Sequence, residues 1–324
     1  MFWLILISIT IIYFLLDHLI RYLKVGGYSN RYVFVTGCDS GFGRELVLRL
    51  DKMSFHVFAC CYTTDGRRSL QETCSSRVDV LSLDVSSDVS ILAAVNTVKQ
   101  KLPNGNGIWA VVNNAGVIGR TVAAEMCTKK DHQDCYNVNL LGAIEVSRVF
   151  MPLLRKSKGR LVNVASCMGR CAAENAPYSV SKFAIEAYSD VVRREVAAFG
   201  VKVSLIEPGY TRSGLFHVDE LHEGIRESFQ RLDPEIQEAY GKDYMEYAQA
   251  VLGARLDRLS PHSYRVTDAF IGAITSIYPR PRYVVGYDAK FVYVPLSFLP
   301  EWIGDWVIIA YDKYLAKQKG FTFK

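Results

Sequence analysis

The segment TGCDSGFG, residues 36–43, places three glycines, Gly37, Gly41 and Gly43, between two segments of different character. Before it, RYVFV is a run of Val and aromatic residues that predicts a β-strand; after it, RELVLRL has apolar residues at helical spacing. A glycine-rich turn between a strand and a helix is the setting of a dinucleotide site, because backbone N–H groups and the helix N-terminus hold phosphates. The segment therefore predicts a dinucleotide-binding fold, although its G-x-x-x-G-x-G spacing differs from the usual G-x-G-x-x-G.

The glycines of this loop have separate expected roles. Gly37 permits the turn, Gly41 lets the backbone approach the pyrophosphate, and Gly43 lets the helix pack on the strand. The predicted cofactor contacts of the loop are Gly37, Asp39, Ser40, Gly41, Phe42 and Gly43.

An acidic residue, Asp39, lies inside the loop. Backbone groups are expected to hold the pyrophosphate, so Asp39 need not face it, and its charge is expected to repel the 2′-phosphate of NADP. The second predicted strand ends in CCYTTDGRR, with no acid at its tip, and Arg67 and Arg68 could serve a phosphate. Asp65 comes a few residues late. Asp39 thus favours NAD over NADP without settling the choice.

Strand-like and helix-like segments alternate six times through the chain up to the EPG of residues 207–209. This order predicts an α/β fold, a single Rossmann-type doubly wound parallel sheet with helices on both faces. Residues 26–290 are expected to form this domain, and residues 213–262 a lid of two or three polar helices inserted over the site. A further helix near residues 266–277 and a last strand, RYVVG, complete the pattern.

Both ends of the chain differ from this pattern. Residues 1–25 contain a continuous apolar run without a basic residue before it or a small-residue cleavage site after it, which predicts an uncleaved membrane anchor. Arg21, Lys24 and Arg31 follow the run, so the catalytic domain is expected to face the cytosol. Residues 291–324 are rich in aromatics and are interpreted as an oligomer contact, a membrane-surface patch or ordinary core packing.

Composition limits the function classes. The net charge of the 324 residues is only +5 and no basic cluster is visible, so no nucleic-acid partner is expected. The eight cysteines show no C-x-x-C spacing and no Cys/His cluster, so no metal site is predicted and reduced, buried thiols are expected. Cys60 and Cys61 should point to opposite faces of a strand.

The catalytic candidates are Ser166, Tyr178 and Lys182. Tyr178 and Lys182 are four residues apart on a predicted helix and share a face, and Ser166 ends the fifth predicted strand. A nearby ammonium lowers the pKa of a tyrosine, so Tyr178 can exchange a proton with a substrate oxygen while hydride moves at the adjacent carbon. Ser166 would bind that oxygen, and Lys182 would also hold the ribose hydroxyls.

Two other groups lie at predicted strand ends, where a parallel sheet binds its ligand. Asp84 and Val85 end the third strand, and Asp84 is placed to accept a hydrogen bond from an adenine amino group. NNAG, residues 113–116, ends the fourth. Asn113 and Asn114 can tie loops together, and Ala115 and Gly116 leave room for the cofactor ribose. Asn113, Ala115 and Gly116 are included among the predicted cofactor contacts.

These motifs together resemble the short-chain dehydrogenase/reductase family over roughly residues 30–290. The matching features are TGCDSGFG, the Asp84-Val85 pair, NNAG, Ser166, YSVSK and EPG. The resemblance implies that Asn139 is a fourth catalytic residue, which distorts its helix and holds a water linked to Lys182. It also implies that Pro208, Gly209 and Thr211 contact the nicotinamide end.

Within this family, DAKFVYVPLSFLP and the helix around Tyr178 resemble the membrane-anchored retinol dehydrogenase and 17β-(3α-)hydroxysteroid dehydrogenase branch. The resemblance implies hydride transfer between NAD and the hydroxyl or carbonyl of a lipophilic alcohol, in the endoplasmic reticulum membrane, by a homodimer. Glu174 and Asn175 precede Tyr178 where a wholly apolar wall would suit retinol, and they favour a lipid with a second polar group.

Two alternatives remain at this stage. A 3-hydroxybutyrate-like hydroxyacid dehydrogenase shares the glycine loop and much of the Tyr178 helix, and Arg170, Arg212 and His217 are candidates for binding its carboxylate. A non-catalytic lipid-binding scaffold is the alternative of another class. The presence of Asn139, Ser166, Tyr178 and Lys182 argues against it.

Overall fold

Seven parallel strands form one sheet in the computed structural model, which describes residues 2–321. Their spatial order is β3-β2-β1-β4-β5-β6-β7, so the chain reverses direction across the sheet between β3 and β4. The strands are β1 (Tyr32–Val35), β2 (His56–Cys61), β3 (Val78–Ser82), β4 (Ala110–Asn113), β5 (Arg160–Val164), β6 (Lys202–Pro208) and β7 (Arg282–Val285). The predicted parallel, doubly wound sheet is confirmed, and the reversal at β1 and β4 is where such sheets bind ligands.

The five inner strands of the sheet are buried on both sides, and their side chains alternate between two cores. Val33 and Val35 of β1 enter the core on one face, whereas Phe34 enters the core on the other. Cys61 and Cys60 divide in the same way, as predicted. All eight cysteines, each within the described residues, are free thiols.

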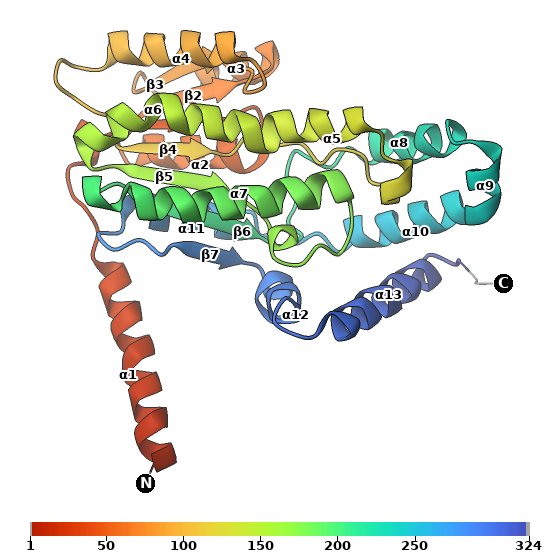
Figure 1. The fold of residues 1–324 in the computed structure, drawn as a ribbon. Helices are drawn as coiled ribbons and strands as arrows, with labels where there is room; N and C mark the ends of the chain where they lie inside the picture. Colours follow the sequence, from red (N-terminus) through yellow and green to blue (C-terminus); the bar gives the residue numbers. More distant parts are fainter. Residues whose placement is uncertain (1, 322–324) are drawn as a thin grey trace.

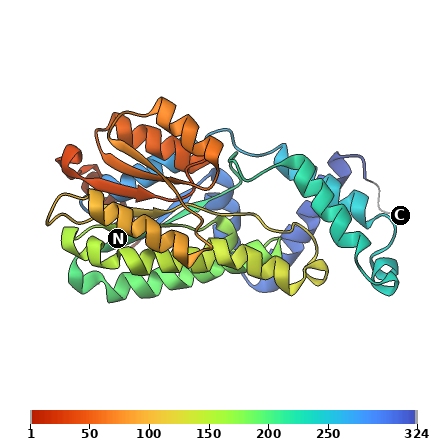
Figure 2. The ribbon, with the colours of Figure 1, turned by 90° about the horizontal axis from the view of Figure 1, so that it is seen from above.

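Helices cover both faces of the sheet (Figures 1 and 2). One core contains residues of α2 (Gly41–Lys52), α3 (Thr64–Thr73) and α11 (Tyr264–Thr275). The opposite core contains residues of α4 (Asp88–Lys101), α6 (Ala143–Ser157) and α7 (Ala176–Glu195). The glycine loop therefore lies between β1 and the first covering helix, at the carboxyl edge of the strands.

The chain between β4 and β5 contains a run of three consecutive helical segments. α5 (Lys129–Tyr136) continues into a π-helix, η3 (Asn137–Gly142), before α6 begins. The wider π-turn contains Asn139, so the expected distortion of the helix at this residue is present. A single π-turn within an α-helix is common at functional sites.

Two predicted strands end earlier than expected. β3 ends at Ser82, so Asp84 and Val85 lie in the following turn, and Asp84 accepts hydrogen bonds from the N–H and hydroxyl of Ser86. This local side-chain bonding competes with the sheet ladder and ends the strand. β5 ends at Val164, and Ser166 instead caps the short helix η4 (Cys167–Gly169).

The insertion after β6 forms three helices, at the upper end of the predicted range. They are α8 (Val218–Gln230), α9 (Pro234–Tyr240) and α10 (Tyr244–Leu256), and Figure 2 shows them extending beyond the sheet. The C-terminal segment comprises η6 (Ala289–Tyr293), α12 (Val294–Leu296) and α13 (Glu301–Gln318). α13 packs on α10 through a small apolar cluster that includes Leu315, Ala316, Val251 and Ala254.

The N-terminal segment is one helix, α1 (Phe2–Tyr22), which projects away from the domain (Figure 1). Within the described residues it contains the one window, Ile5–Tyr22, that is long and apolar enough to cross a membrane, and none of that window is buried. Its base is tied to the domain: Arg21 donates to Asp17, and Asp17 also pairs with Arg280. Next to the helix, Val25 N donates to the carbonyl of Thr275 at 2.8 Å.

Candidate active site

A cavity of about 250 Å³ lies at the carboxyl edge of the sheet. Its wall includes the glycine loop, the turns after β4, β5 and β6, the start of α7 and part of the lid. The lining residues used below are Gly37, Asp39, Ser40, Gly41, Phe42, Asn114, Ala115, Gly116, Val164, Ser166, Glu174, Tyr178, Lys182, Pro208, Gly209, Tyr210, Thr211, Phe216 and Arg255.

The glycine loop has the geometry of a phosphate site. Gly37 and Gly41 have positive φ values of 69° and 54°, which side chains with a Cβ rarely adopt. A Cβ at Gly43 would lie only 2.2 Å from the carbonyl oxygen of Gly37, so this glycine permits close packing of helix and loop. Ser40 is the N-cap of α2, yet its side chain makes no capping hydrogen bond. The N-terminus of α2 therefore keeps N–H groups available for an anion.

The Asp39 carboxylate lies at the tip of β2, the position where the sequence showed no acid. It accepts hydrogen bonds from the backbone N–H groups of Tyr62 at 2.9 Å and Thr63 at 2.7 Å. It also accepts from the Thr63 hydroxyl at 2.6 Å. The loop after β1 thus supplies a carboxylate to the end of the neighbouring strand. Arg67 is bonded beside it, to Ser82 and Thr64.

Asn114 fixes the glycine loop against the turn after β4. Its side-chain amide donates to the carbonyls of Thr36 at 3.0 Å and Gly37 at 2.9 Å. The Thr36 hydroxyl accepts in return from the N–H groups of Asn114 and Ala115, both at 3.0 Å. This reciprocal bonding confirms the expected loop tie and leaves Ala115 and Gly116 on the cavity wall.

Asn113 has a different place. It is buried, and its amide donates to the hydroxyl of Ser147 at 2.9 Å and to Asn163 at 2.8 Å. These bonds join β4 to α6 and β5, and the Asn113 side chain does not line the cavity. Asp84, Val85 and Gly43 are likewise not among the described residues that line it.

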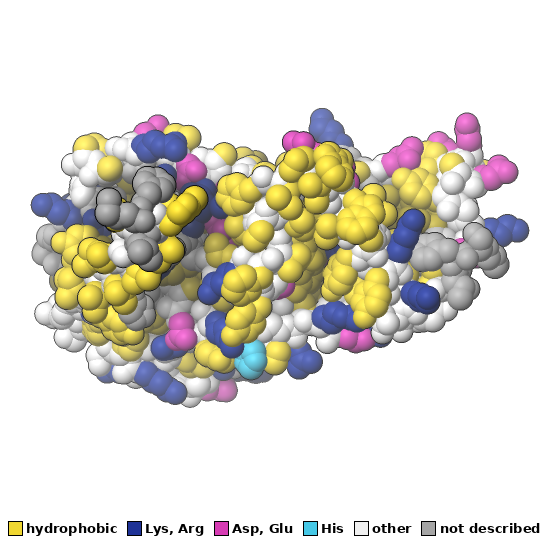
Figure 3. All heavy atoms as spheres, turned by 90° about the horizontal axis from the view of Figure 1, so that it is seen from below, with side chains coloured by type: hydrophobic (Ala, Val, Ile, Leu, Met, Phe, Trp, Pro, Cys, Tyr) yellow, Lys and Arg dark blue, Asp and Glu magenta, His cyan; other side chains and the backbone are white. Residues whose placement is uncertain are grey.

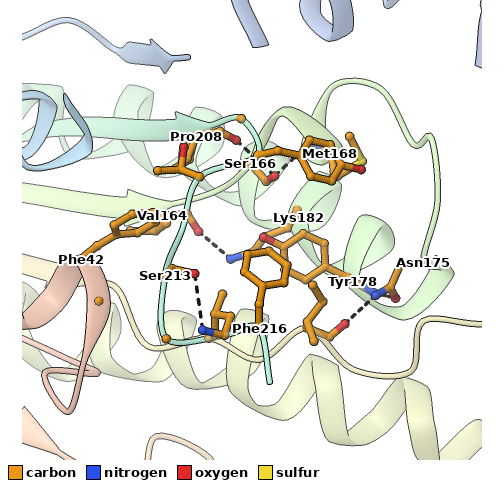
Figure 4. A pocket seen from close by; sticks show the side chains of 18 of the residues that line it. Phe42, Val164, Ser166, Met168, Asn175, Tyr178, Lys182, Pro208, Ser213 and Phe216 are labelled. Carbon is orange, nitrogen blue, oxygen red and sulfur yellow. Dashed lines mark hydrogen bonds between the residues drawn. The ribbon is translucent and has the colours of Figure 1, made fainter. Parts of the chain in front are cut away.

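Tyr178 is positioned by the start of α7. Asn175, with a φ of 53°, is the N-cap of this helix, and its side chain accepts from the N–H of Tyr178 at 3.2 Å. Its amide donates to the carbonyl of Ile118 at 2.8 Å. Asn175 lines the cavity, but both ends of its side-chain amide are engaged in holding this loop and helix, so it does not favour a substrate lipid with a second polar group. Figure 4 shows Tyr178 facing the cavity beside Lys182 and Phe216.

Ser166 is buried on the same wall of the cavity, close to the Tyr178 hydroxyl. Its hydroxyl donates to the carbonyl of Pro208 at 3.4 Å and accepts from the N–H of Met168 at 3.2 Å (Figure 4). The first bond is long, so the hydroxyl can turn toward a substrate oxygen.

Lys182 lies one helical turn after Tyr178. Its ammonium donates to the carbonyl of Val164 at 2.9 Å and lies 5.4 Å from the centre of the Tyr178 ring. Burial lowers the pKa of Lys182 to about 8, against the charge effects of Cys135 and Glu186. Burial also raises the pKa of Tyr178, and the Ser166 hydroxyl only partly opposes this effect. In the chain alone, burial therefore outweighs the expected lowering of the Tyr178 pKa.

Asn139 is buried behind this pair and bonds the turn after β4. Its oxygen accepts from Val117 N at 2.8 Å, and its amide donates to Val117 O at 2.9 Å and to the Ser181 hydroxyl at 3.1 Å. A Cβ at Gly116 would lie 3.2 Å from the Asn139 oxygen and 3.8 Å from the Lys182 ammonium, so both groups flank this glycine.

The far wall contains a polar cluster that sequence reasoning had missed. Tyr210 donates to Glu174, and Arg255 donates to the Tyr210 hydroxyl at 3.1 Å. Arg255 also pairs with Glu174 and with Asp312 of α13. The charge of Glu174 is thus balanced inside the protein. No sequence pattern links these residues, because they come from four separate segments.

The lid also contributes to the wall, through Ser213, Gly214, Leu215, Phe216, Leu252, Arg255 and Leu256. A Cβ at Gly41 would lie 2.9 Å from the N–H nitrogen of Gly214, so this part of the lid approaches the glycine loop closely. Arg170, Arg212 and His217, the candidates for binding a substrate carboxylate, do not line this cavity.

Comparisons with known proteins agree with this geometry. A sequence model of the short chain dehydrogenase family matches residues 31–223. The chain is 38% identical to 17-beta-hydroxysteroid dehydrogenase type 6 of Homo sapiens over 306 residues, 94% of this chain and 96% of the relative. It is 39% identical to retinol dehydrogenase 7 of Rattus norvegicus, again over 94% of this chain and 96% of the relative.

Solved structures show the same fold. A short chain dehydrogenase/reductase of Burkholderia phymatum in complex with NAD has a TM-score of 0.68 at 20% identity, covering 84% of this chain and 94% of the other. A short chain dehydrogenase of Burkholderia cenocepacia in complex with NADP has a TM-score of 0.63 at 19% identity, covering 86% and 97%.

Proposed function

Because this chain belongs to the short-chain dehydrogenase family, whose fold binds a nicotinamide cofactor, we propose that it oxidises or reduces a lipophilic alcohol of the retinol or hydroxysteroid class with NAD. The observation that carries the proposal is the convergence of Ser166, Tyr178 and Lys182 on one cavity wall beside the glycine loop. Bound NAD would supply the acceptor of the hydride that leaves the carbinol carbon.

Three residues of the cavity have separate roles in moving the proton and holding the substrate oxygen and the cofactor. Ser166 hydrogen-bonds the reacting oxygen, and Tyr178 takes the hydroxyl proton as the carbon–oxygen bond becomes a carbonyl. In the reverse direction Tyr178 returns this proton to the oxygen. Because burial raises its pKa, Tyr178 carries its proton at neutral pH in the chain alone and is ready to act as the acid. Lys182 holds the ribose hydroxyls and favours the phenolate by its charge.

The cofactor would bind along the loops already described. Gly37, Ser40 and Gly41 would face the pyrophosphate at the uncapped start of α2, and Ala115 and Gly116 would pack on the ribose. Pro208, Gly209 and Thr211 line the end of the cavity nearest Ser166 and are assigned to the nicotinamide. We assign Asp84 and Val85 to the adenine end from their turn beyond β3, and Phe42 to the same wall.

The choice of NAD rests on Asp39. Its carboxylate lies at the carboxyl end of β2, where the ribose hydroxyls of a dinucleotide bind in this fold. A carboxylate accepts hydrogen bonds from free hydroxyls and repels a 2′-phosphate. Arg67 opposes this preference, because it lies beside the same strand end.

The lipophilic substrate class is supported by the apolar lid side chains on the wall of the catalytic cavity, Phe216, Leu252 and Leu256. It is also supported by the two relatives, which are named after lipophilic alcohols. The hydroxyacid alternative is not favoured, because the guanidinium on the wall, Arg255, is already paired with two carboxylates. A non-catalytic scaffold is not favoured either, since these relatives are named dehydrogenases.

We further propose that α1 anchors the protein in the endoplasmic reticulum membrane with the domain in the cytosol. The face from which α1 projects also exposes apolar side chains of the C-terminal segment (Figure 3). These include Phe291, Phe298, Trp302 and Trp306, each about 70% exposed. A homodimer would use α7, whose outer surface exposes Val180, Phe183 and Val191.

Turnover of a panel of retinols, hydroxysteroids, fatty alcohols and 3-hydroxy acids with NAD tests the proposal. The wild-type chain is expected to oxidise a retinol or a hydroxysteroid, and Tyr178→Phe to lose at least about 100-fold in kcat while still binding NADH. Preference for 3-hydroxy acids would contradict the substrate class, and normal turnover by Tyr178→Phe would contradict the mechanism.

A further inference from the structure

A second cavity, of about 510 Å³, lies behind the far wall of the catalytic cavity. Tyr210 and Arg255 line both cavities, so one layer of side chains separates them. The second cavity extends under the C-terminal segment, and its apolar lining includes Val292, Tyr293, Leu296, Val307, Ile308 and Tyr311.

The separating layer is held by a few polar contacts. Arg255 is 5% exposed and uses both terminal nitrogens, one on Tyr210 and Glu174 and the other on Asp312. Its Nε has no hydrogen-bond partner among the described residues. A buried donor without a partner is costly, so an acceptor oxygen passing this layer would be stabilised there.

The outer side of the second cavity lies on the face that carries α1. Val307 and Ile308 of α13 line the cavity, whereas Trp306 and Ile309 of the same helix are 69% and 55% exposed. Figure 3 shows apolar side chains gathered on this face. α13 thus has one side toward the cavity and the other toward the proposed membrane surface.

Size gives a further argument. Cavities that hold small lipophilic ligands usually measure about 300–1,000 Å³. The catalytic cavity, at about 250 Å³, must hold the nicotinamide end as well as the reacting carbon. The second cavity is large enough for the apolar body of a retinoid or a steroid.

We infer that the second cavity is a binding site for the lipophilic alcohol, which enters it from the bilayer and passes Tyr210 and Arg255 to reach Tyr178. This inference rests on the proposed function. The alcohol or carbonyl oxygen accepts a hydrogen bond from Arg255 Nε as it passes, while the apolar body contacts Val292, Leu296 and Ile308. The substrate then moves between the membrane and the reacting groups without crossing water.

Two neighbouring positions on α13 provide a matched pair of variants. Ile308→Trp fills the second cavity, whereas Ile309→Trp adds the same bulk to the exposed side. With retinol or a hydroxysteroid in phosphatidylcholine vesicles, Ile308→Trp is expected to lower kcat/KM at least about tenfold, and Ile309→Trp to leave it near wild type. Equal activity of both variants and the wild type would overturn the inference.

Photolabelling provides a readout that does not need turnover or a folded variant. A sterol carrying a diazirine, in the same vesicles, is expected to label Leu296, Val307 and Ile308 in the wild-type chain, and excess unlabelled sterol to prevent this. Labels confined to the exposed Trp306 and Ile309 would overturn the site. If these inward labels form but no alcohol is oxidised, the lipid site is supported and the proposed function fails. If alcohols are oxidised without inward labels, the function stands and the site is wrong.

Discussion

The Lys182 ammonium and the Tyr178 ring lie on one face of α7, with the nitrogen 5.4 Å from the ring centre. Burial shifts the pKa values of the two groups in opposite directions. It lowers the pKa of Lys182 and raises the pKa of Tyr178, so both neutral forms are favoured. Any stabilisation of the Tyr178 phenolate by its neighbour therefore depends on the positive charge of Lys182. This charge is lost when the pH rises through about 8.

We expect kcat/KM for NADH in carbonyl reduction, which reports on the free enzyme, to fall about tenfold per pH unit above about 8. The sign follows because deprotonation removes the ammonium that we propose holds the ribose. Lys182→Arg keeps its charge throughout this range, so the falling limb should move above pH 10 even if overall activity is lower. A limb that stays near pH 8 in the variant would assign it to another group.

Asp39 provides a test of cofactor choice. Asp39→Asn removes the charge but keeps an oxygen that can accept from Thr63 N. We expect the ratio of kcat/KM for NADP to that for NAD to rise at least about tenfold, because a repulsion of ~1.4 kcal/mol is lost. Asp65→Asn is the matched control, since its side chain is 89% exposed on the adjacent helix α3. An unchanged ratio in Asp39→Asn would contradict the selector role.

The arrangement around Asp39 also shows where sequence reasoning stops. The glycine loop could be recognised because its strand, turn and helix are consecutive, and Tyr178 and Lys182 because helical spacing puts them on one face. The meeting of Asp39 with Thr63 depends on the pairing of β1 with β2, so no local pattern reveals it. The segment that ends β2 has no acid of its own at its tip, and the carboxylate found there comes from the loop after β1.

The polar contacts of the far wall could not be predicted from the sequence for the same physical reason. Glu174, Tyr210, Arg255 and Asp312 lie on separate segments, and their ion pairs form only after the lid and α13 have packed together. Sequence reasoning treated Glu174 and Asn175 as substrate contacts. The structure instead gives Glu174 internal partners and makes Asn175 a helix cap.

Asn139 holds both backbone groups of Val117 and is 2% exposed. Asn139→Ala removes the partner of these two part-buried groups, and at about 0.5–1.5 kcal/mol for each hydrogen bond we expect a loss of about 1–3 kcal/mol in the free energy of unfolding. The same change should reduce kcat by displacing Gly116 beside Lys182. Asn137→Ala, in the same π-turn but exposed, is the control and should change neither the thermal midpoint nor kcat. Equal effects of the two variants would mean that the π-turn, not Asn139, sets the site.

The two membrane contacts proposed for this chain can be separated. A chain lacking residues 1–20 loses α1 but keeps Lys24 and Val25, which bond the domain at Ser276 and Thr275. We expect it to sediment still with phosphatidylcholine vesicles, because the aromatic side chains of the C-terminal segment remain.

Adding Trp302→Ser and Trp306→Ser to the shortened chain should weaken vesicle binding at least about tenfold, since burial of each large apolar side chain contributes about 1.5–3 kcal/mol. Val89→Ser is the control: this side chain is 79% exposed, but it lies on α4, beside β3, at the opposite edge of the sheet from β7 and α13 (Figure 1). If the shortened chain stays in the supernatant before any Trp is changed, α1 is the sole membrane contact. In that case the second cavity does not face a bilayer, and the entry route inferred for the alcohol loses its source.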